Sequence, residues 1–141
     1  MYNEDIMDFP SWGKKKVDFK GNGLPVVTLS DGMQLAESGP TSIYYGKLFG
    51  QYPRDPAMAH MMEMLMAQYM DCFNAYTPAH MAKDDAKIKE VIEGKIAVFL
   101  AKLEPMLAKM KFICGEKLTV IDFWVGAMYC DRCANPNLDN P

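Results

Sequence analysis

Apolar residues recur at every third or fourth position over two long stretches in the second half of the chain. The first stretch covers residues 56–77 and the second covers residues 84–110. This spacing places the apolar side chains on one face of a helix, so both stretches are predicted to be helical. Pro78 is expected to end or kink the first helix, because proline lacks an N–H and disfavours a helical residue before it. Pro105 should bend the second helix near its end.

A different pattern, short β-branched runs around a turn, precedes the long helices. Residues 26–29 and 33–36 are separated by a Ser-Asp-Gly turn, and glycine tolerates the positive φ angle that hairpin turns need. We therefore predict an antiparallel hairpin over residues 24–36. Leu24-Pro25 comes directly before the first strand, where a proline fits, and is a candidate for a cis peptide bond.

The hairpin is expected to pass directly into a short helix. Ser38 is predicted as the N-cap of this helix, with Pro40 in its first turn and the helix over residues 39–48. Residues 50–55 contain a glycine and a proline that break the chain into a linker. The hairpin therefore ends on the pair Glu37-Ser38 at the mouth of a helix.

The strongest local signal in the sequence is the stretch GEKLTVIDFW, which predicts a further helix over residues 120–131. Thr119 and Asp122 have the spacing of a capping box, in which each side chain bonds to the backbone N–H of the other residue. Leu118 and Phe123 have the spacing of a hydrophobic staple. Replacing either capping residue with alanine is expected to cost about 1 kcal/mol, and the two losses should not add fully because both residues serve one cap.

Composition and charge narrow the classes of protein that fit this chain. Its 141 residues are 50% apolar and 23% charged with a formal net charge of −3, which fits one globular domain or parts of two small ones. The acidic balance gives no basic footprint for nucleic acid. No apolar run approaches the roughly 18 residues of a membrane span, and the acidic N-terminus is not a signal peptide. We therefore expect no nucleic-acid partner and no membrane partner.

The four cysteines indicate reduced thiols and a cytoplasmic location, because the chain is long and has no secretory signal. Cys130 and Cys133 have the CxxC spacing of redox and zinc sites. Zinc needs a second pair of cysteine or histidine ligands, and His60 and His80 are distant in the sequence. We therefore interpret the CxxC pair as a coincidence at a helix end that can still oxidise, and we predict no metal site.

The pair Glu37-Ser38 is the best candidate for a binding site. A helix N-terminus carries partial positive charge and free N–H groups, so it attracts a carboxylate. Ser38 adds a hydroxyl donor, and Glu37 can accept a hydrogen bond from an ammonium group beside that carboxylate. The terminus of an α-amino acid presents both groups at once. The alternative, from the residues alone, is that Ser38 only caps the helix and Glu37 is a solvated acid.

The order of these features resembles the glutathione transferase family, which joins a thioredoxin-like half to an all-helical half. Leu24-Pro25 resembles the cis-proline motif of the family, and FICGEKLTVID resembles its capping box and staple. Glu37-Ser38 resembles its Gln/Glu-Ser motif, where the backbone and hydroxyl take the γ-glutamyl carboxylate of glutathione. The resemblance covers nearly the whole chain.

The resemblance implies two parts. Residues 1–50 are expected to form a partial thioredoxin-like, glutathione-binding domain of the α/β class, consisting of the hairpin and a helix. Residues 51–141 are expected to form a partial all-α C-terminal domain, which makes the molecule mostly helical. The family opens with a strand-helix-strand unit whose first strand carries the catalytic Tyr, Ser or Cys, and residues 1–22 contain no apolar strand. We therefore expect a chain truncated at both ends, with no catalytic residue of its own.

The resemblance also assigns roles to single residues. The backbone of Leu24, which precedes Pro25, would pair with the cysteinyl part of glutathione. Trp12 and Lys16 are similar to residues that some classes place against the glycine end, although tryptophan is as often a packing anchor. Asp71 corresponds to an acid that some classes use to reach the γ-glutamyl ammonium in the partner subunit, and the alternative is an exposed helix acid.

The sequence departs from the family pattern around the acid-serine pair. Gly23 stands where a glutamine or asparagine is common. The family usually follows its serine with an Ala-Ile and an Arg-Tyr, and of these the present chain keeps only Tyr44. These differences concern the shape of the tripeptide site and leave the predicted fold unchanged.

The activity implied by the resemblance is addition of the glutathione thiolate to an electrophile, or reduction of peroxides with it. Glutathione would be a co-substrate, no other cofactor is expected, and residues 1–141 alone are expected to be inactive.

The methionines between residues 58 and 70 are interpreted first as side chains that fill the core. They cover more than one face of their helix, so this helix can also bury surface against another chain. The family dimerises partly through this helix, so a homodimer is expected. The alternatives are a non-catalytic assembly module and, more distantly, a thiol-redox protein acting through Cys130 and Cys133.

Overall fold

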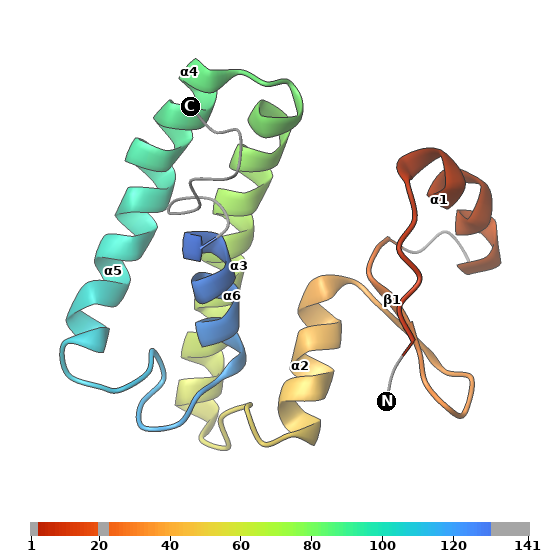
Figure 1. Cartoon of the computed structure of the whole chain (residues 1–141). Coiled ribbons are helices and arrows are strands. Elements are labelled where there is room, and N and C mark those ends of the chain that lie inside the picture. Colours follow the sequence, from red (N-terminus) through yellow and green to blue (C-terminus); the bar gives the residue numbers. More distant parts are fainter. Residues whose placement is uncertain (1–2, 20–22, 131–141) are drawn as a thin grey trace. The chain divides into compact units, whose positions relative to one another are not determined.

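The computed structural model describes residues 3–19 and 23–130, which form two compact units divided between Tyr45 and Gly46. The first unit contains a hairpin and the second contains the long helices (Figure 1). Helix α2, Ser38–Leu48, runs across the division. The fold class is confirmed as a mostly helical chain with a two-stranded hairpin. In the described part of the chain, no helix is both long enough and apolar enough to cross a membrane.

The first unit is built on the predicted hairpin. Strands β1 (Val26–Thr28) and β2 (Gln34–Ala36) pair in an antiparallel ladder. Gly32 has a φ angle of 86°, a conformation that glycine adopts without steric cost, so the turn requires it. The carboxylate of Asp31 supports the same turn, because it accepts a hydrogen bond from the N–H of Met33 at 2.9 Å.

Two short helical segments precede the hairpin. Helix α1 (Phe9–Lys15) is capped by the side chain of Asp8 and continues into the 3-10 turn η1 (Lys16–Phe19). Trp12 is the buried residue of α1, and its ring packs against the ring of Phe19 with 5.6 Å between the centroids. This contact gives the first segment of the chain a small core of its own.

The second unit is organised around α3 (Pro56–Met81). Helix α4 (Asp85–Val91), the π-helical turn η2 (Ile92–Ile96) and α5 (Ala97–Leu107) follow one another as one long rod, and α6 (Val120–Met128) completes the bundle. The rod and α6 both pack against α3, as Figure 1 shows. The buried side chains of this core include Met62, Leu65, Met66, Cys72, Tyr76, Ile88, Val91, Ile96, Phe99, Leu103, Ile121 and Met128.

The observed helices differ from the predicted boundaries in several places. Helix α3 continues past Pro78 to Met81, although proline lacks an N–H and crowds the preceding turn, and the buried Ala79 packs the last turn against the core. The second long stretch ends at Leu107 and contains the π-helical turn, which the sequence pattern did not predict. Helix α6 ends at Met128, and the last residue predicted for it lies outside the described residues.

The π-helical turn η2 follows from the spacing of buried residues. Val91 and Ile96 are both buried although they are five positions apart, whereas neighbours on one face of an α-helix are three or four positions apart. A π-helical turn accommodates the extra residue, so both side chains stay in the core. The thiol of Cys72 in α3 donates a weak hydrogen bond to the carbonyl oxygen of Lys95 in this turn, at 3.8 Å.

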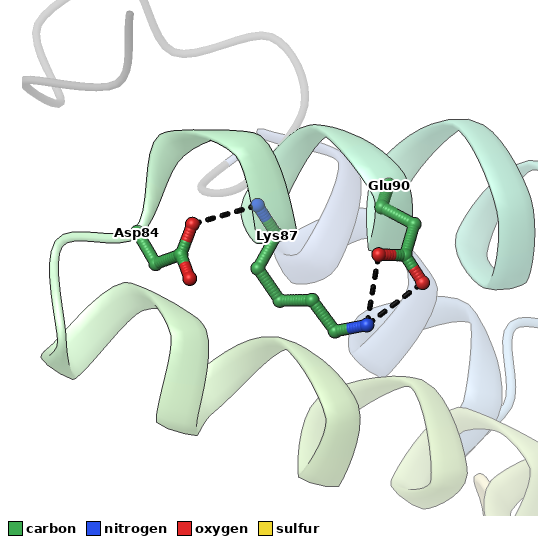
Figure 2. A network of polar contacts seen from close by, with 3 residues as sticks. All are labelled: Asp84, Lys87 and Glu90. Carbon is green, nitrogen blue, oxygen red and sulfur yellow. Dashed lines mark hydrogen bonds and ion pairs between the residues drawn. The ribbon is translucent and has the colours of Figure 1, made fainter.

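Aspartate side chains fix the starts of α3 and α4. The carboxylate of Asp55 accepts a hydrogen bond from the N–H of Met58 at 2.9 Å. Asp84 does the same for the N–H of Lys87 at 2.9 Å, and the ammonium of Lys87 pairs with both carboxylate oxygens of Glu90 at 2.7 and 2.8 Å (Figure 2). An exposed ion pair of this kind contributes about 0.5 kcal/mol or less, so these contacts set where the helix begins more than they stabilise the bundle.

The linker after α2 is tied to the start of α6. The N–H of Gln51 donates to the carbonyl oxygen of Gly46 at 2.7 Å, and the carbonyl oxygen of Gln51 accepts from the N–H of Val120 at 3.1 Å. A helix start leaves such N–H groups without partners inside the helix, and here the linker supplies one. A Cβ atom on Gly46 would collide with the side chain of Val120, so this close approach requires glycine.

Candidate functional site

The ladder of the hairpin brings the two predicted binding segments to the same end of the sheet. The start of β1 lies opposite the end of β2, so the residues just outside the ladder are Leu24 and Pro25 on one side and Glu37 and Ser38 on the other. The Leu24–Pro25 peptide bond is cis, which confirms the prediction. We refer to Gly23, Leu24, Glu37 and Ser38 together as the corner.

The backbone of the corner is held by Thr41, a residue that sequence reasoning did not single out. The N–H of Thr41 donates to the carbonyl oxygen of Glu37 at 3.0 Å, and its hydroxyl donates to the carbonyl oxygen of Ala36 at 3.2 Å. Only 7% of the Thr41 surface is exposed. A threonine three residues after the predicted N-cap was the available signal, because its hydroxyl can reach back to carbonyl groups of the preceding turn.

The start of α2 differs from the predicted one. The helix begins at Ser38, and the carbonyl oxygen of Glu37 accepts the first hydrogen bond, so Ser38 lies in the first turn and is not the N-cap. Glu37 has a φ angle of 67°. This left-handed conformation is uncommon for a residue with a side chain and costs about 1 kcal/mol or more. Sequence pattern does not reveal such a backbone, which explains why the helix start was predicted one residue too late.

The side chain of Glu37 is exposed and lies over the main chain of Gly23. A Cβ atom on Gly23 would be only 3.1 Å from Oε1 of Glu37. Among the residues that the structure describes, no hydrogen bond or ion pair engages the carboxylate of Glu37. The negative charge is therefore available to a ligand.

The corner combines features that suit a group carrying both an ammonium and a carboxylate. The N-terminus of α2 presents N–H groups and partial positive charge, and its first turn contains no acidic residue. Ser38 is half-buried in this turn, and Glu37, with an exposed carboxylate, precedes it directly in the chain. A ligand carboxylate would meet the N–H groups and a ligand ammonium would meet Glu37.

Trp12 and Lys16 lie near each other in the chain, but the structure favours a packing role for Trp12. The indole ring is buried against Phe19, and the N–H of Lys16 donates to the carbonyl oxygen of Trp12. The side chain of Lys16 is exposed. Within residues 3–19 and 23–130, no hydrogen bond or ion pair joins either residue to Glu37 or Ser38.

Asp71 lies on an exposed face of α3, in the second unit. His60, Met64, Ala67 and Asp71 are all exposed and are separated by three or four positions, so they share one face of the helix. Met64 is 45% exposed, although the neighbouring Met62 and Met66 belong to the core. The methionine-rich segment therefore contributes side chains to the core and also leaves apolar surface exposed, which are the two interpretations that the sequence allowed.

The capping box at the start of α6 forms between Thr119 and Asp122. The carboxylate of Asp122 accepts from the N–H and from the hydroxyl of Thr119, each at 2.8 Å. It also accepts from the N–H of Ile113 at 2.8 Å, a bond that the capping-box pattern did not predict. Phe123, the predicted staple residue, is 51% exposed, and the staple contact with Leu118 stays a prediction.

The described cysteines are free thiols, and two of them are buried. Burial raises the pKa of the Cys72 thiol and of the Cys114 thiol, because desolvation penalises the thiolate. Cys130 is exposed, and Cys133 lies outside the described residues. Within the described ranges, no three His, Cys, Asp or Glu side chains are grouped in a way that would hold a metal ion.

An open apolar hollow lies in the second unit, between α5 and α6. Its volume is about 650 Å³, and its walls include Leu103, Leu107, Ile113 and Val125. The polar groups at its wall include Asp122, whose carboxylate is occupied by the capping bonds. The sequence did not predict this hollow, because it depends on how two distant helices pack.

Comparisons with known proteins support the fold described above. Residues 70–137 match the family model of the glutathione S-transferase C-terminal domain. The structure of rat hPGDS complexed with a quinoline matches 88% of the chain with a TM-score of 0.75 at 16% sequence identity. A delta-class glutathione transferase of Nilaparvata lugens matches 87% with a TM-score of 0.64 at 23% identity. A search of curated protein sequences gave no significant match.

The fold and the corner define a two-part protein, with a thioredoxin-like hairpin and helix followed by a helical bundle. The family match over residues 70–137 and the two fold matches then give the class: this is a glutathione S-transferase-like protein. It spans 63% of the rat chain and 62% of the insect chain, less than two thirds of each.

Proposed function

We propose that this glutathione transferase-like protein binds glutathione at the corner, which is the binding step of the transfer reaction that the resemblance implies. The observation that carries the proposal is the convergence of the Glu37 carboxylate, the N-terminus of α2 and the backbone of Leu24 at one end of the hairpin. The match of residues 70–137 to the glutathione S-transferase C-terminal domain supports the same ligand, because glutathione transferases bind the tripeptide in their thioredoxin-like half.

Each group of the corner has a separate part in this proposal. The N–H groups at the start of α2 and the hydroxyl of Ser38 take the γ-glutamyl carboxylate. The carboxylate of Glu37 takes the neighbouring ammonium as a charge-assisted hydrogen bond. The backbone of Leu24, next to Pro25, pairs with the cysteinyl part. Lys16, exposed at the end of α1, is proposed for the glycine carboxylate, and Trp12 for packing beside it.

Binding at the corner does not by itself activate the thiol of glutathione. A free cysteine thiol has a pKa of about 8.5, so only a few per cent is thiolate at neutral pH. A catalyst needs a donor placed on the sulfur, and the hydroxyls of the corner have other partners: that of Thr41 donates to Ala36, and that of Ser38 is assigned to the γ-glutamyl end. We therefore expect residues 1–141 to bind glutathione without accelerating its conjugation.

Isothermal titration calorimetry with glutathione tests the binding proposal. Glu37→Gln should weaken binding by about tenfold or more, because it removes a charge-assisted bond, and Ser38→Ala by about threefold to tenfold. Exposed residues of the same type away from the corner, changed as Glu116→Gln and Ser30→Ala, are the matched controls and should leave the affinity unchanged. Failure of the wild-type chain to bind, or equal effects in the controls, would refute the site.

A conjugation assay on the same preparations separates binding from turnover. The rate with a model electrophile should equal the uncatalysed rate. Saturable acceleration by residues 1–141 would show that a group of this chain activates the thiol, and it would contradict the expected inactivity while leaving the binding proposal intact.

We further propose that the protein forms a homodimer through the exposed face of α3 and acts in the cytoplasm. Support for the dimer comes from Met64 and Ala67 on that face, with Asp71 beside them as a candidate contact to the partner's ligand. The free thiols of Cys72, Cys114 and Cys130 support a reducing compartment. The same exposed face is what a non-catalytic assembly module would use, and the absence of glutathione binding together with dimer formation would favour that alternative.

A further inference from the structure

The hairpin of the first unit is a sheet of two strands, so β1 and β2 each have an outer edge (Figure 1). Among the residues that the structure describes, no further strand pairs with either edge. A two-stranded sheet is only marginally stable in water, and the N–H and C=O groups on its edges can pair with another strand. The two edges of this hairpin differ in how far their backbone groups are already used.

The register of the ladder shows which backbone groups of β1 face outward. In an antiparallel pair, successive residues direct their N–H and C=O groups alternately towards the partner strand and away from it. The N–H of Leu29 donates to the carbonyl oxygen of Met33 at 2.8 Å, in the same register as the ladder. Val27, two positions before Leu29, therefore also faces β2. Val26 and Thr28 direct their N–H and C=O groups to the outer edge.

The outer edge of β2 is already in use, and that of β1 is open. The carbonyl oxygen of Ala36 faces outward by the same alternation, and it accepts the hydrogen bond from the hydroxyl of Thr41 at 3.2 Å. In the described part of the chain, no hydrogen bond beyond the hairpin engages the backbone of Val26 or Thr28. Residues 26–28 also contain no charged side chain and no proline, two features that commonly protect strand edges.

We propose that the outer edge of β1 pairs with the same edge of a second copy of this chain, antiparallel about a two-fold axis at Val27. This register places Val26 of each copy opposite Thr28 of the other, so that every outward N–H meets an outward C=O. Val27 faces its own counterpart across the axis, which adds a contact between β-branched side chains.

A second copy is the partner that this edge fits because the edge is complementary to itself. The outward groups are two positions apart, and an identical strand running the other way presents acceptors and donors at the same spacing. The edge belongs to the first unit, whereas the face of α3 proposed for the homodimer belongs to the second. The two surfaces therefore use different residues, and edge pairing is independent of glutathione binding at the corner.

Disulfide trapping in the full chain tests the register. Cys130 and Cys133 are first changed to serine, because Cys130 is an exposed thiol. Val27→Cys should then cross-link two copies under mild oxidation, because facing residues of a pair without hydrogen bonds lie close enough for a disulfide. Thr28→Cys, on the same edge, is the matched control. It faces Val26 of the other copy and should cross-link about fivefold less.

Sedimentation equilibrium tests the hydrogen bonds of the edge, in a Met64→Lys background that weakens the proposed α3 dimer. Thr28→Pro should weaken the remaining self-association by about tenfold or more, because each copy loses an outward N–H. The ladder within the hairpin should persist, because the N–H of Thr28 takes no part in it. Gln34→Pro makes the same change on the outer edge of β2 and should leave the dissociation constant unchanged.

The outcomes decide for or against pairing at this edge. A Met64→Lys chain that stays monomeric and gives no cross-link at position 27 would overturn the inference. Equal cross-linking at positions 27 and 28 would show random collision, and equal effects of the two proline variants would show association elsewhere; either result overturns it. If Thr28→Pro loses the hairpin by circular dichroism, the comparison of the two cysteine variants decides.

Discussion

At the scale of single residues, the corner depends on backbone geometry that a buried hydroxyl stabilises. The left-handed conformation of Glu37 is unfavourable by itself and persists because surrounding bonds determine it. Thr41 supplies two of those bonds, one from its N–H to Glu37 and one from its hydroxyl to Ala36. The position of the candidate ligand-binding acid is thus set by a residue that is not itself proposed to touch the ligand.

The contribution of Thr41 can be measured with Thr41→Val, which keeps the shape of the side chain and removes the hydroxyl. We expect a loss of about 1 kcal/mol in unfolding free energy, because the carbonyl oxygen of Ala36 loses a donor in a buried place. Urea denaturation measures the loss, and glutathione affinity should fall with it. The matched control is Thr28→Val on the exposed side of β1, expected to stay within about 0.5 kcal/mol of the wild type. Equal behaviour of the two variants would show that the hydroxyl bond does not hold the corner.

At the scale of elements, the carboxylate of Asp122 joins two segments that the capping-box pattern treats separately. It caps α6 through Thr119 and also binds the N–H of Ile113 in the preceding turn. Ile113 is 2% exposed, so its N–H has no ready access to water. The start of α6 is therefore fixed to the turn before it as well as capped.

This third bond changes the stability expected from the sequence. Asp122→Ala should cost about 2–3 kcal/mol, because it leaves a buried N–H unpaired, whereas Thr119→Ala should still cost about 1 kcal/mol. The double variant should lose less than the sum, because the two side chains share one bond. Chemical denaturation of the four proteins gives the comparison. Equal single losses that add fully would argue against the role given to Ile113.

At the scale of the whole molecule, sequence patterns predicted the features that depend on neighbours in the chain. Helical spacing located α3 and the rod of α4 and α5, the Asp-Gly turn located the hairpin, and local spacing located the capping box. The features that were missed depend on contacts between distant residues: the carboxylate of Glu37 over Gly23, and the bond from Ile113 to Asp122. Such contacts produce no repeating pattern in the amino-acid sequence, because each involves one pair of atoms.

Self-association is the prediction that belongs to this scale. A methionine on the exposed face of α3 would be buried in the proposed dimer, so Met64→Lys should weaken dimerisation by about tenfold or more, through the cost of burying a charge. Sedimentation equilibrium measures the dissociation constant. Met81→Lys, at an exposed methionine in the last turn of α3, is the control and should change little. A wild-type chain that stays monomeric at micromolar concentration would contradict the proposed dimer.

The π-helical turn η2 accommodates one residue more than a regular α-helix would hold between α4 and α5. Deleting Gly94, which is exposed in this turn, would place Val91 and Ile96 four positions apart and allow an uninterrupted α-helix with the same buried face. We expect the shortened chain to fold with a stability within about 1 kcal/mol of the parent in urea. Deleting Val98 instead leaves Ile96 and Phe99 two positions apart, turns one of them towards solvent, and should cost about 2 kcal/mol or more. If the two deletions proved equally damaging, the turn would not be absorbing an extra residue. If they behave as expected, the protein tolerates the in-frame loss of the codon for Gly94 and does not tolerate the loss of the codon for Val98.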